Sequence, residues 1–260
     1  MHIEIDDFIE KNQQKLLLWA IENGEHVLIT GPRGAGKTRL AEWAARKLER
    51  PIEVCHFGSA VDPESVLQGS TRLENGKTFF TRARFVEAVT VPNSVIVLDE
   101  INRAGDAKTQ GMLMSAMDDQ RRLYLEQEAP GRQVVDLAAG VVIIATANLG
   151  PAYCGTEALD PALLDRFMKI RIKYSDREPE VLRSLGLGDR EIRRVMKIAV
   201  EIRSQHECGA FPDTISTRGL VRVASVLIGG IGTYNAFTST LGFWDPESDA
   251  TVRTLCELTR

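Results

Sequence analysis

The sequence predicts an α/β fold with a mainly parallel sheet, followed by a small domain built only of helices. Short, wholly apolar runs alternate with helical patterns as far as about residue 175, which is typical of strands buried in a parallel sheet. A glycine-rich loop joins the first of these runs to a helix. Beyond residue 175 the apolar residues recur only at helical spacing, so we divide the chain into domains at 1–175 and 176–260.

Each element follows from a local pattern. An amphipathic helix over 6–23, capped by Asp6 or Asp7, precedes the first strand. The predicted strands lie at 26–30, 52–57, 94–98, 141–146 and 169–172. The predicted helices of this domain lie at 38–49 and 106–118, with a short one that begins at Pro161 and ends near 165–167. Residues 62–91 are mixed, and 120–137 resemble a hairpin with its turn at 130–131. The second domain is expected to hold helices at 177–183, 189–205, 217–228 and 247–258.

The composition narrows the functional classes. The chain has 260 residues, of which 43% are hydrophobic and 26% charged, as in an ordinary soluble protein. Its net charge of −4 disfavours non-specific nucleic-acid binding. Without a run of roughly 20 apolar residues or a basic leader, we expect no membrane partner and a cytoplasmic location. Cys55, Cys154, Cys208 and Cys256 lie too far apart for a zinc motif.

Residues 31–38 read GPRGAGKT and fit the pattern G-x-x-x-x-G-K-[ST] at every fixed position. Glycines let the backbone point its N–H groups at phosphates, and the following helix adds its positive N-terminal end. Lys37 can reach the β- and γ-phosphates, and Thr38 offers a hydroxyl ligand to Mg²⁺. A chance match in a glycine-rich turn is the alternative. The residues expected to bind ATP are Gly31, Pro32, Arg33, Gly34, Ala35, Gly36, Lys37, Thr38, Arg39 and Arg218.

A pair of carboxylates follows the apolar run at 95–98. Ligands of open α/β sheets bind at the carboxyl ends of the strands, which is where Asp99 and Glu100 stand. We expect Asp99 to hold Mg²⁺ through its water shell. Glu100 would polarise the attacking water as a general base, an effect worth about 10²–10⁴ in rate. The alternative is two solvated carboxylates that open a loop.

Two further polar residues are candidates for contact with the nucleotide. Asn148 follows the apolar run at 141–146, where it either fixes a turn or lies beside Glu100 to orient the attacking water. Arg218 stands in the first turn of a predicted helix, where a cation is electrostatically unfavourable. That local conflict indicates a nucleotide sensor rather than an ordinary solvated arginine.

Arg166 ends the short helix that Asp160 and Pro161 begin. One interpretation is a surface salt bridge with Asp165 or Glu157, which would contribute little. The other is an arginine finger that reaches the γ-phosphate bound to a neighbouring subunit. Such a finger supplies about 10³–10⁵ in rate by neutralising transition-state charge.

Taken together, these segments resemble the AAA+ superfamily, and within it the MoxR-type branch that includes CbbQ and NorQ. The resemblance is carried by GPRGAGKT, VLDEINRA, IIATANLG, YCGTEALDPALLDRF and STRGL over residues 24–230. It implies an α/β nucleotide domain, a helical lid, and a ring usually of six identical subunits that hydrolyses ATP with Mg²⁺. By position it assigns Lys37 and Thr38 to Walker A, Asp99 and Glu100 to Walker B, Asn148 to sensor 1, Arg166 to the finger and Arg218 to sensor 2.

The resemblance also implies two inserts, at 70–82 and 119–135, that line or cap the pore of the ring. Phe79 and Phe80 are expected to pack in the core or the hairpin rather than to grip a client. The arginines that either contact a partner or are ordinary surface are Arg82, Arg84, Arg121 and Arg122, and Arg103 is a candidate for contact with a neighbouring subunit. Whether Arg218 acts on its own or a neighbour's nucleotide stays open.

Three functions follow from this. The first is a chaperone-like ATPase that remodels a separate protein client, often through a partner with a von Willebrand A domain. The second is a nucleic-acid motor or loader, which the acidic charge disfavours. The third is a non-catalytic scaffold gated by nucleotide, which the intact Lys37, Glu100 and Arg166 disfavour.

Overall fold

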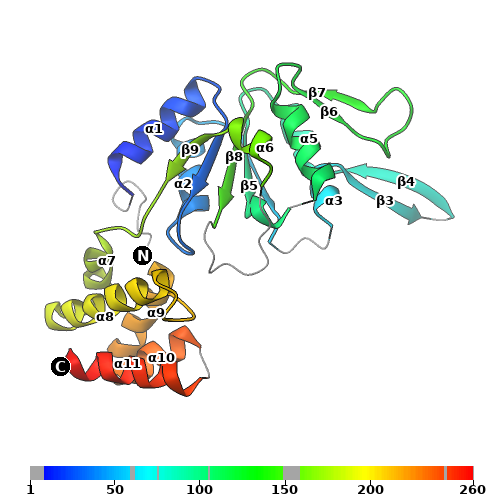
Figure 1. The fold of residues 1–260 in the computed structure, drawn as a ribbon. Helices are drawn as coiled ribbons and strands as arrows, with labels where there is room; N and C mark the ends of the chain where they lie inside the picture. Colours follow the sequence, from blue (N-terminus) through cyan, green and yellow to red (C-terminus); the bar gives the residue numbers. More distant parts are fainter. Residues whose placement is uncertain are drawn as a thin grey trace.

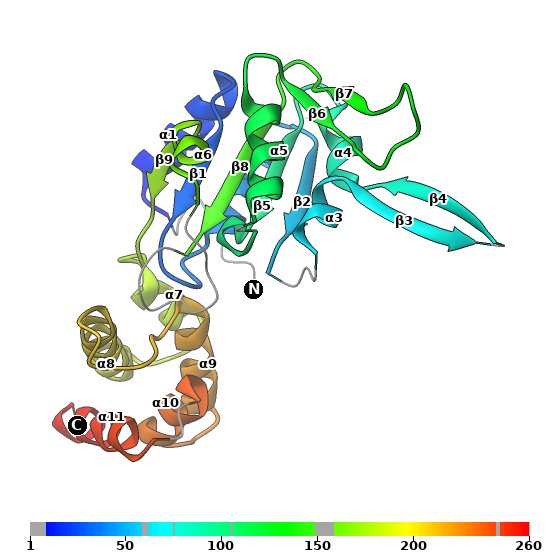
Figure 2. The same ribbon diagram turned by 45° about the vertical axis from the view of Figure 1, so that its right-hand side comes forward.

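The computed structural model describes residues 9–58, 62–74, 76–104, 106–148, 159–242 and 245–259. An α/β part and a helical part are joined by the segment that leaves strand β9 (Figure 1). Two hairpins project from the side of the α/β part (Figure 2). Within the described ranges, no helix is both long and apolar enough to cross a bilayer.

The central sheet contains five parallel strands in the order β2-β5-β8-β1-β9. Their bounds are β1 Val27–Thr30, β2 Ile52–His56, β5 Val95–Asp99, β8 Val142–Ala147 and β9 Met168–Arg171. The helices of this part are α1 Lys11–Glu22, α2 Lys37–Lys47, α3 Pro63–Leu67, α4 Arg84–Val89, α5 Ala107–Met117 and α6 Pro161–Asp165. A short 3₁₀ turn occupies Ile101–Arg103.

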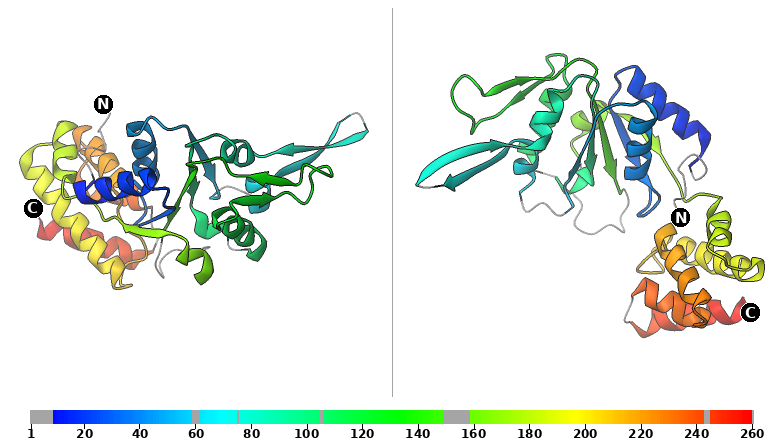
Figure 3. Two further views of the ribbon diagram at one scale, coloured as in Figure 1. Left: turned by 90° about the horizontal axis from the view of Figure 1, so that it is seen from above. Right: turned by 180° about the vertical axis from the view of Figure 1, so that it is seen from behind.

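Helices cover both faces of the sheet, which is why its three central strands β1, β5 and β8 are apolar on both sides. Alternate strand residues point to opposite faces, so Val27 and Ile29 join the cluster under α1 and α2, whereas Leu28 joins the cluster under α4 and α5. The view from above shows the same layering (Figure 3). Parallel pairing brings the carboxyl ends of β1, β5 and β8 to one edge of the sheet.

The two hairpins are β3 (Gly69–Glu74) with β4 (Lys77–Arg82), and β6 (Arg122–Tyr124) with β7 (Val134–Asp136). Side chains tie them together. The Arg82 guanidinium donates to Glu128 Oε2 at 2.7 Å and to the Arg132 carbonyl at 3.1 Å, and Thr71 donates to Gln127 at 2.9 Å. The hairpins therefore form one connected projection.

The helical part contains α7 (Glu178–Ser184), α8 (Asp189–Glu207), α9 (Thr217–Ile228), α10 (Thr233–Leu241) and α11 (Pro246–Leu258). It has its own apolar core, in which Val195, Leu220 and Phe237 are fully buried. Because this core is separate from the two clusters of the sheet, the helices pack mainly on each other.

Most elements agree with the sequence prediction, and the differences have physical reasons. The first helix begins at Lys11, Leu16 on it is 42% exposed, and its proposed caps Asp6 and Asp7 lie outside the described residues. Helix α10 was not predicted, because its Thr, Ser and Asn residues are weak helix formers. The mixed segment forms α3, the β3–β4 hairpin and α4, and Phe79 lies on the hairpin with 51% of its surface exposed, so of the two expected places it is not in the core.

Candidate nucleotide site

The glycine-rich loop joins β1 to α2 at the carboxyl edge of the sheet. Gly34 and Gly36 have φ values of +72° and +94°, in the left-handed region that favours glycine. At Gly31 a Cβ would lie 2.5 Å from the carbonyl oxygen of Ile172, so a side chain does not fit there. The loop thus takes its course because of its glycines, and α2 begins at its last turn.

Lys37 is folded back over this loop. Its Nζ donates to the carbonyls of Gly31 (3.0 Å) and Pro32 (2.9 Å) and to Asn148 Oδ1 (2.5 Å). The residue is only 8% exposed, and burial lowers its pKa from 10.5 to about 8, although the carboxylates of Asp99 and Glu100 oppose the shift. An ammonium held here by loop carbonyls is positioned for an anion.

Asp99, at the end of β5, collects hydroxyl groups from two other elements. Thr38 Oγ1 donates to Asp99 Oδ1 at 2.5 Å, and Thr146 Oγ1 on β8 donates to the same oxygen at 2.8 Å. His56 Nδ1 lies 3.2 Å from Asp99 Oδ2. A carboxylate beside a hydroxyl is a donor set of hard oxygens, which fits Mg²⁺ held partly by water.

Glu100 adopts φ +58° and ψ +47°, a left-handed conformation that is uncommon for a residue with a side chain. Its backbone N–H donates to Thr146 Oγ1 at 3.1 Å, and its Oε2 forms an ion pair of 2.7 Å with Arg103 Nε. Strained backbone of this kind is typical of functional sites. The pair means that Arg103, expected to face a neighbouring subunit, contacts a carboxylate of its own chain.

These residues line one cleft between the α/β part and the helical part, with a volume of about 920 Å³. The volume suits a small-molecule ligand. From the first domain it takes Arg33, Gly34, Gly36, Lys37, Thr38, Arg39, Asp99, Glu100, Thr146 and Asn148. Gly31, Pro32 and Ala35 do not line it, and Ala35 is buried in the core.

The helical part contributes the start of α9 to the same cleft. Arg218 and, one turn later, Arg222 line it. Ser216 caps α9 by accepting from the Gly219 N–H at 3.1 Å, and it lies against the loop, since a Cβ on Gly34 would be 2.6 Å from Ser216 Cβ. Arg218 therefore lines the same cleft as the glycine-rich loop of its own chain.

Arg166 lies elsewhere, at the end of α6. Its guanidinium forms an ion pair of 2.6 Å with Asp118, which follows α5, and donates to the Ala162 carbonyl at 2.6 Å. The partner in this salt bridge is thus Asp118 and not Asp165; Glu157, Cys154 and the motif residues 153–158 lie outside the described residues. Arg166 does not line the cleft of its own chain.

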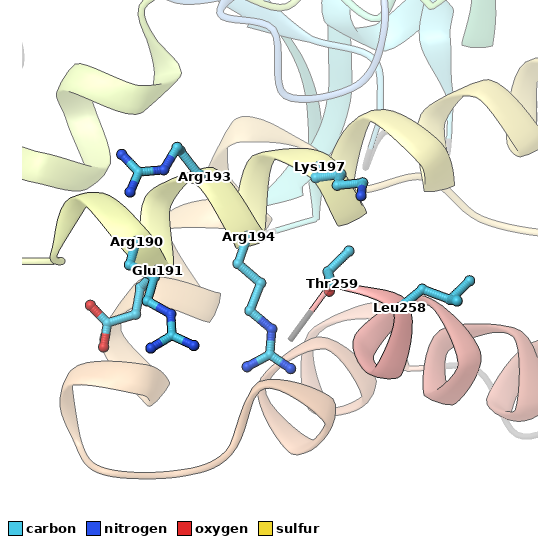
Figure 4. A pocket seen from close by; sticks show the side chains of 7 residues that line it. All are labelled: Arg190, Glu191, Arg193, Arg194, Lys197, Leu258 and Thr259. Atoms are coloured by element: carbon cyan, nitrogen blue, oxygen red, sulfur yellow. The ribbon is translucent and has the colours of Figure 1, made fainter.

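A second cleft of about 730 Å³ lies within the helical part, between α8 and the end of α11 (Figure 4). Its cationic side chains are Arg190, Arg193, Arg194 and Lys197. Arg194 donates to the Cys256 carbonyl at 2.7 Å, so it caps the C-terminal end of α11. None of the residues predicted to act on a nucleotide lines this cleft.

Sequence reasoning missed several residues of the site. Thr146 is the one polar residue of β8 and stands near the end of that apolar strand. This signal would have been sufficient to find it. His56 and Arg222 carry no such signal, because their places depend on the order of the strands and on the position of α9.

Comparison with known proteins identifies the family. Residues 26–167 match the family described as "AAA domain (dynein-related subfamily)", and residues 179–259 match "CbbQ/NirQ/NorQ C-terminal". The chain is 31% identical over 219 residues to the "Putative chaperone BssE" of Thauera aromatica, covering 83% of this chain and 74% of that protein. It is 26% identical over 234 residues to an uncharacterized protein of Staphylococcus saprophyticus, covering 86% and 85%.

Solved structures share the fold. The Holliday junction branch migration motor RuvB of Thermotoga maritima superposes with a TM-score of 0.52 at 21% identity, covering 94% of this chain and 74% of that one. The ATPase-like protein of Cytophaga hutchinsonii gives 0.50 at 21% identity, covering 94% and 80%. With the phosphate loop, the parallel sheet and both family matches in agreement, the chain belongs to the AAA+ ATPases of the MoxR type, with a CbbQ/NirQ/NorQ C-terminal region.

Proposed function

We propose that this chain hydrolyses ATP to ADP and phosphate with Mg²⁺ in the cleft between its two parts, and uses the energy to remodel a protein client. The observation that carries the proposal is the convergence of Lys37, Thr38, Asp99, Glu100 and Asn148 on one cleft. These residues lie at or just after the ends of three neighbouring strands: β5, β8 and β1, the last of which leads into the glycine-rich loop. A single triphosphate can therefore reach all of them.

Each residue has a role in this proposal. Lys37 exchanges its loop carbonyls and Asn148 for the β- and γ-phosphates. Thr38 and Asp99 would hold Mg²⁺, and the ion would supply positive charge beside the phosphates. Glu100 leaves Arg103 and accepts a proton from the attacking water. Once Lys37 no longer donates to it, the side-chain amide of Asn148 orients that water.

The proposed ring explains the place of Arg166. Because Arg166 lies outside the cleft of its own chain and is 30% exposed at its side chain, it is suited to reach a nucleotide bound by a neighbouring subunit. Arg218, in contrast, lines its own cleft, which favours action on the same chain's nucleotide. We propose a homo-oligomer, with six subunits as the expected number.

The client is proposed to be a protein in the cytoplasm, engaged directly or through a partner with a von Willebrand A domain. The named relative of Thauera aromatica supports a chaperone-like role. The two tied hairpins, with Phe79 exposed near the tip of one, offer a surface for such a client. The likeness to RuvB concerns the fold and carries no argument for nucleic acid.

Turnover and nucleotide binding test the catalytic proposal. Glu100→Gln should bind ATP as the unchanged chain does and lose about 10²–10⁴ in rate, whereas Lys37→Ala should lose binding. If the unchanged oligomer bound ATP and never hydrolysed it, with or without cell extract, the non-catalytic scaffold would be correct.

Mixing variants tests the finger. Arg166→Ala should keep nucleotide binding and lose turnover, and adding Lys37→Ala subunits should restore part of it, since those subunits supply intact fingers. No restoration at any mixing ratio would contradict action between subunits.

The client is tested with the Glu100→Gln form, crosslinked in its own cell extract with ATP and analysed by mass spectrometry. Recovery of one protein that also stimulates the ATPase would support remodelling. Stimulation by DNA or RNA, with binding that falls steeply as salt rises, would favour the nucleic-acid motor instead.

A further inference from the structure

A chain of contacts runs from the phosphate loop to the residue before Arg218. The Tyr174 hydroxyl donates to the backbone carbonyl of Arg33 in the loop at 3.1 Å. The ring of Tyr174 lies under the Arg203 guanidinium, with 3.7 Å between the guanidinium carbon and the ring centroid. Tyr174 stands in the segment between β9 and α7, so the contact joins the loop to α8 of the helical part.

Arg203 continues the chain of contacts into the interior of the helical part. It forms two hydrogen bonds with the Glu178 carboxylate, at 2.7 Å and 2.9 Å, in the fork geometry that suits a guanidinium. Glu178 is 1% exposed, so its buried carboxylate oxygens need these hydrogen-bond partners. The pair is thus fixed in geometry and orientation.

The same two residues hold the backbone on both sides of Ser216. Arg203 Nε donates to the Ile215 carbonyl at 2.9 Å, and Thr217 Oγ1 donates to Glu178 Oε1 at 2.5 Å. Ile215 and Thr217 flank the cap of α9, and Arg218 is the next residue. The direction in which α9 leaves the cap, and with it the position of Arg218, is therefore set by the Arg203–Glu178 pair.

Resting on the proposed function, we propose that Tyr174, Arg203, Glu178 and Thr217 are positioning residues that couple the phosphate loop to Arg218. A triphosphate that pulls the loop N–H groups inward also moves the Arg33 carbonyl, which Tyr174 follows. A helix that only packed on its neighbours would need neither a buried ion pair at its cap nor a hydroxyl reaching into the loop.

The test is a double-mutant cycle on nucleotide affinity with Tyr174→Phe and Arg218→Ala, using a fluorescent, non-hydrolysable ATP analogue with Mg²⁺. Tyr174→Phe removes the hydroxyl and keeps the ring under Arg203. One hydrogen bond corresponds to an affinity loss of roughly twofold to tenfold. If Tyr174 acts through Arg218, that loss should vanish in the Arg218→Ala background.

Tyr234→Phe is the matched control, because Tyr234 also donates its hydroxyl, in its case to the Asp249 carboxylate, and also lies under an arginine, Arg253. It lies within the helical part, away from the loop, and should leave nucleotide affinity unchanged. Thermal midpoints of all variants should stay close together, which separates positioning from loss of the fold.

Equal losses in the presence and absence of Arg218 would overturn the inference, as would unchanged affinity in Tyr174→Phe or in Arg218→Ala. Thr217→Val should weaken nucleotide binding, because the hydroxyl makes the contact with Glu178. Thr217→Ser keeps a hydroxyl and should keep the nucleotide affinity. These results leave the proposed ATPase untouched, because that proposal is decided by Lys37→Ala and Glu100→Gln.

Discussion

The buried ammonium of Lys37 gives a pH dependence that can be worked out from the structure. Burial lowers its pKa from 10.5 to about 8 in the folded chain without nucleotide. Between these two values the unfolded chain binds the proton and the folded chain does not, so the free energy of unfolding rises with pH across this interval. With about 1.4 kcal/mol for each pH unit, the gain is roughly 3 kcal/mol.

The assay compares the unchanged chain with Lys37→Met. Urea unfolding, followed by circular dichroism from about pH 7.5 to about pH 10.5, gives the free energy of unfolding of both proteins. The Cys55 thiol also contributes, because burial raises its pKa from 9.0 to about 12, so the unfolded chain loses this proton at a lower pH than the folded chain. Both chains share such groups, so the difference between their free energies of unfolding isolates the contribution of Lys37. If this difference in the free energy of unfolding did not change with pH, burial would not lower the pKa of Lys37, and the reasoning would be refuted.

The same pKa predicts proton uptake when ATP binds. The triphosphate restores the charged form of Lys37, because opposite charges close together favour ionisation. At about pH 8 roughly half of the sites take up a proton on binding, and at about pH 9 nearly all do. Calorimetry in two buffers with different ionisation enthalpies measures this uptake. Its absence at both pH values would mean that Lys37 is already fully charged before the nucleotide arrives.

Two further predictions concern stability and the contact between loop and lid. His26 is buried, and burial, with the charge of Arg121, lowers its pKa to about 4, so stability should fall by roughly 3 kcal/mol as the pH drops from about 6.5 to about 4. His26→Gln should remove that fall in urea titrations, and an unchanged acid profile would contradict it. Gly34→Ala should weaken ATP binding because its Cβ would press on Ser216, whereas Gly24→Ala, with a similar φ of +76° and open space around it, should cost stability alone. Equal ATP affinity in both glycine variants would contradict the contact.

The sequence was sufficient for features confined to a few consecutive residues. The glycine-rich loop is recognisable from eight residues, and the convergence of Lys37 with Asp99 follows because parallel strands end at one edge of the sheet. The strands were placed to within one or two residues, most easily the central β1, β5 and β8, since runs buried on both faces have few alternatives.

The remaining features depend on contacts between distant segments. The ion pair of Arg166 with Asp118 joins residues 48 positions apart, and no pattern selects that partner over Asp165. The contact between Glu178 and Thr217 requires α7 and α9 to meet, which helical periodicity does not determine. The pair of Arg103 with Glu100 was not predicted, because the resemblance indicated only a candidate contact of Arg103 with a neighbouring subunit.

The bond between the two hairpins has a mechanical consequence. Arg82 and Thr71, near the base of one hairpin, hold the loop of the other, so the base of the first hairpin and the loop of the second are held together. The β6–β7 hairpin also continues directly from α5, whose first turn lies a few residues after the Asp99–Glu100 pair. A force on either hairpin is thus shared by both and reaches α5, the helix whose other end begins a few residues after those carboxylates.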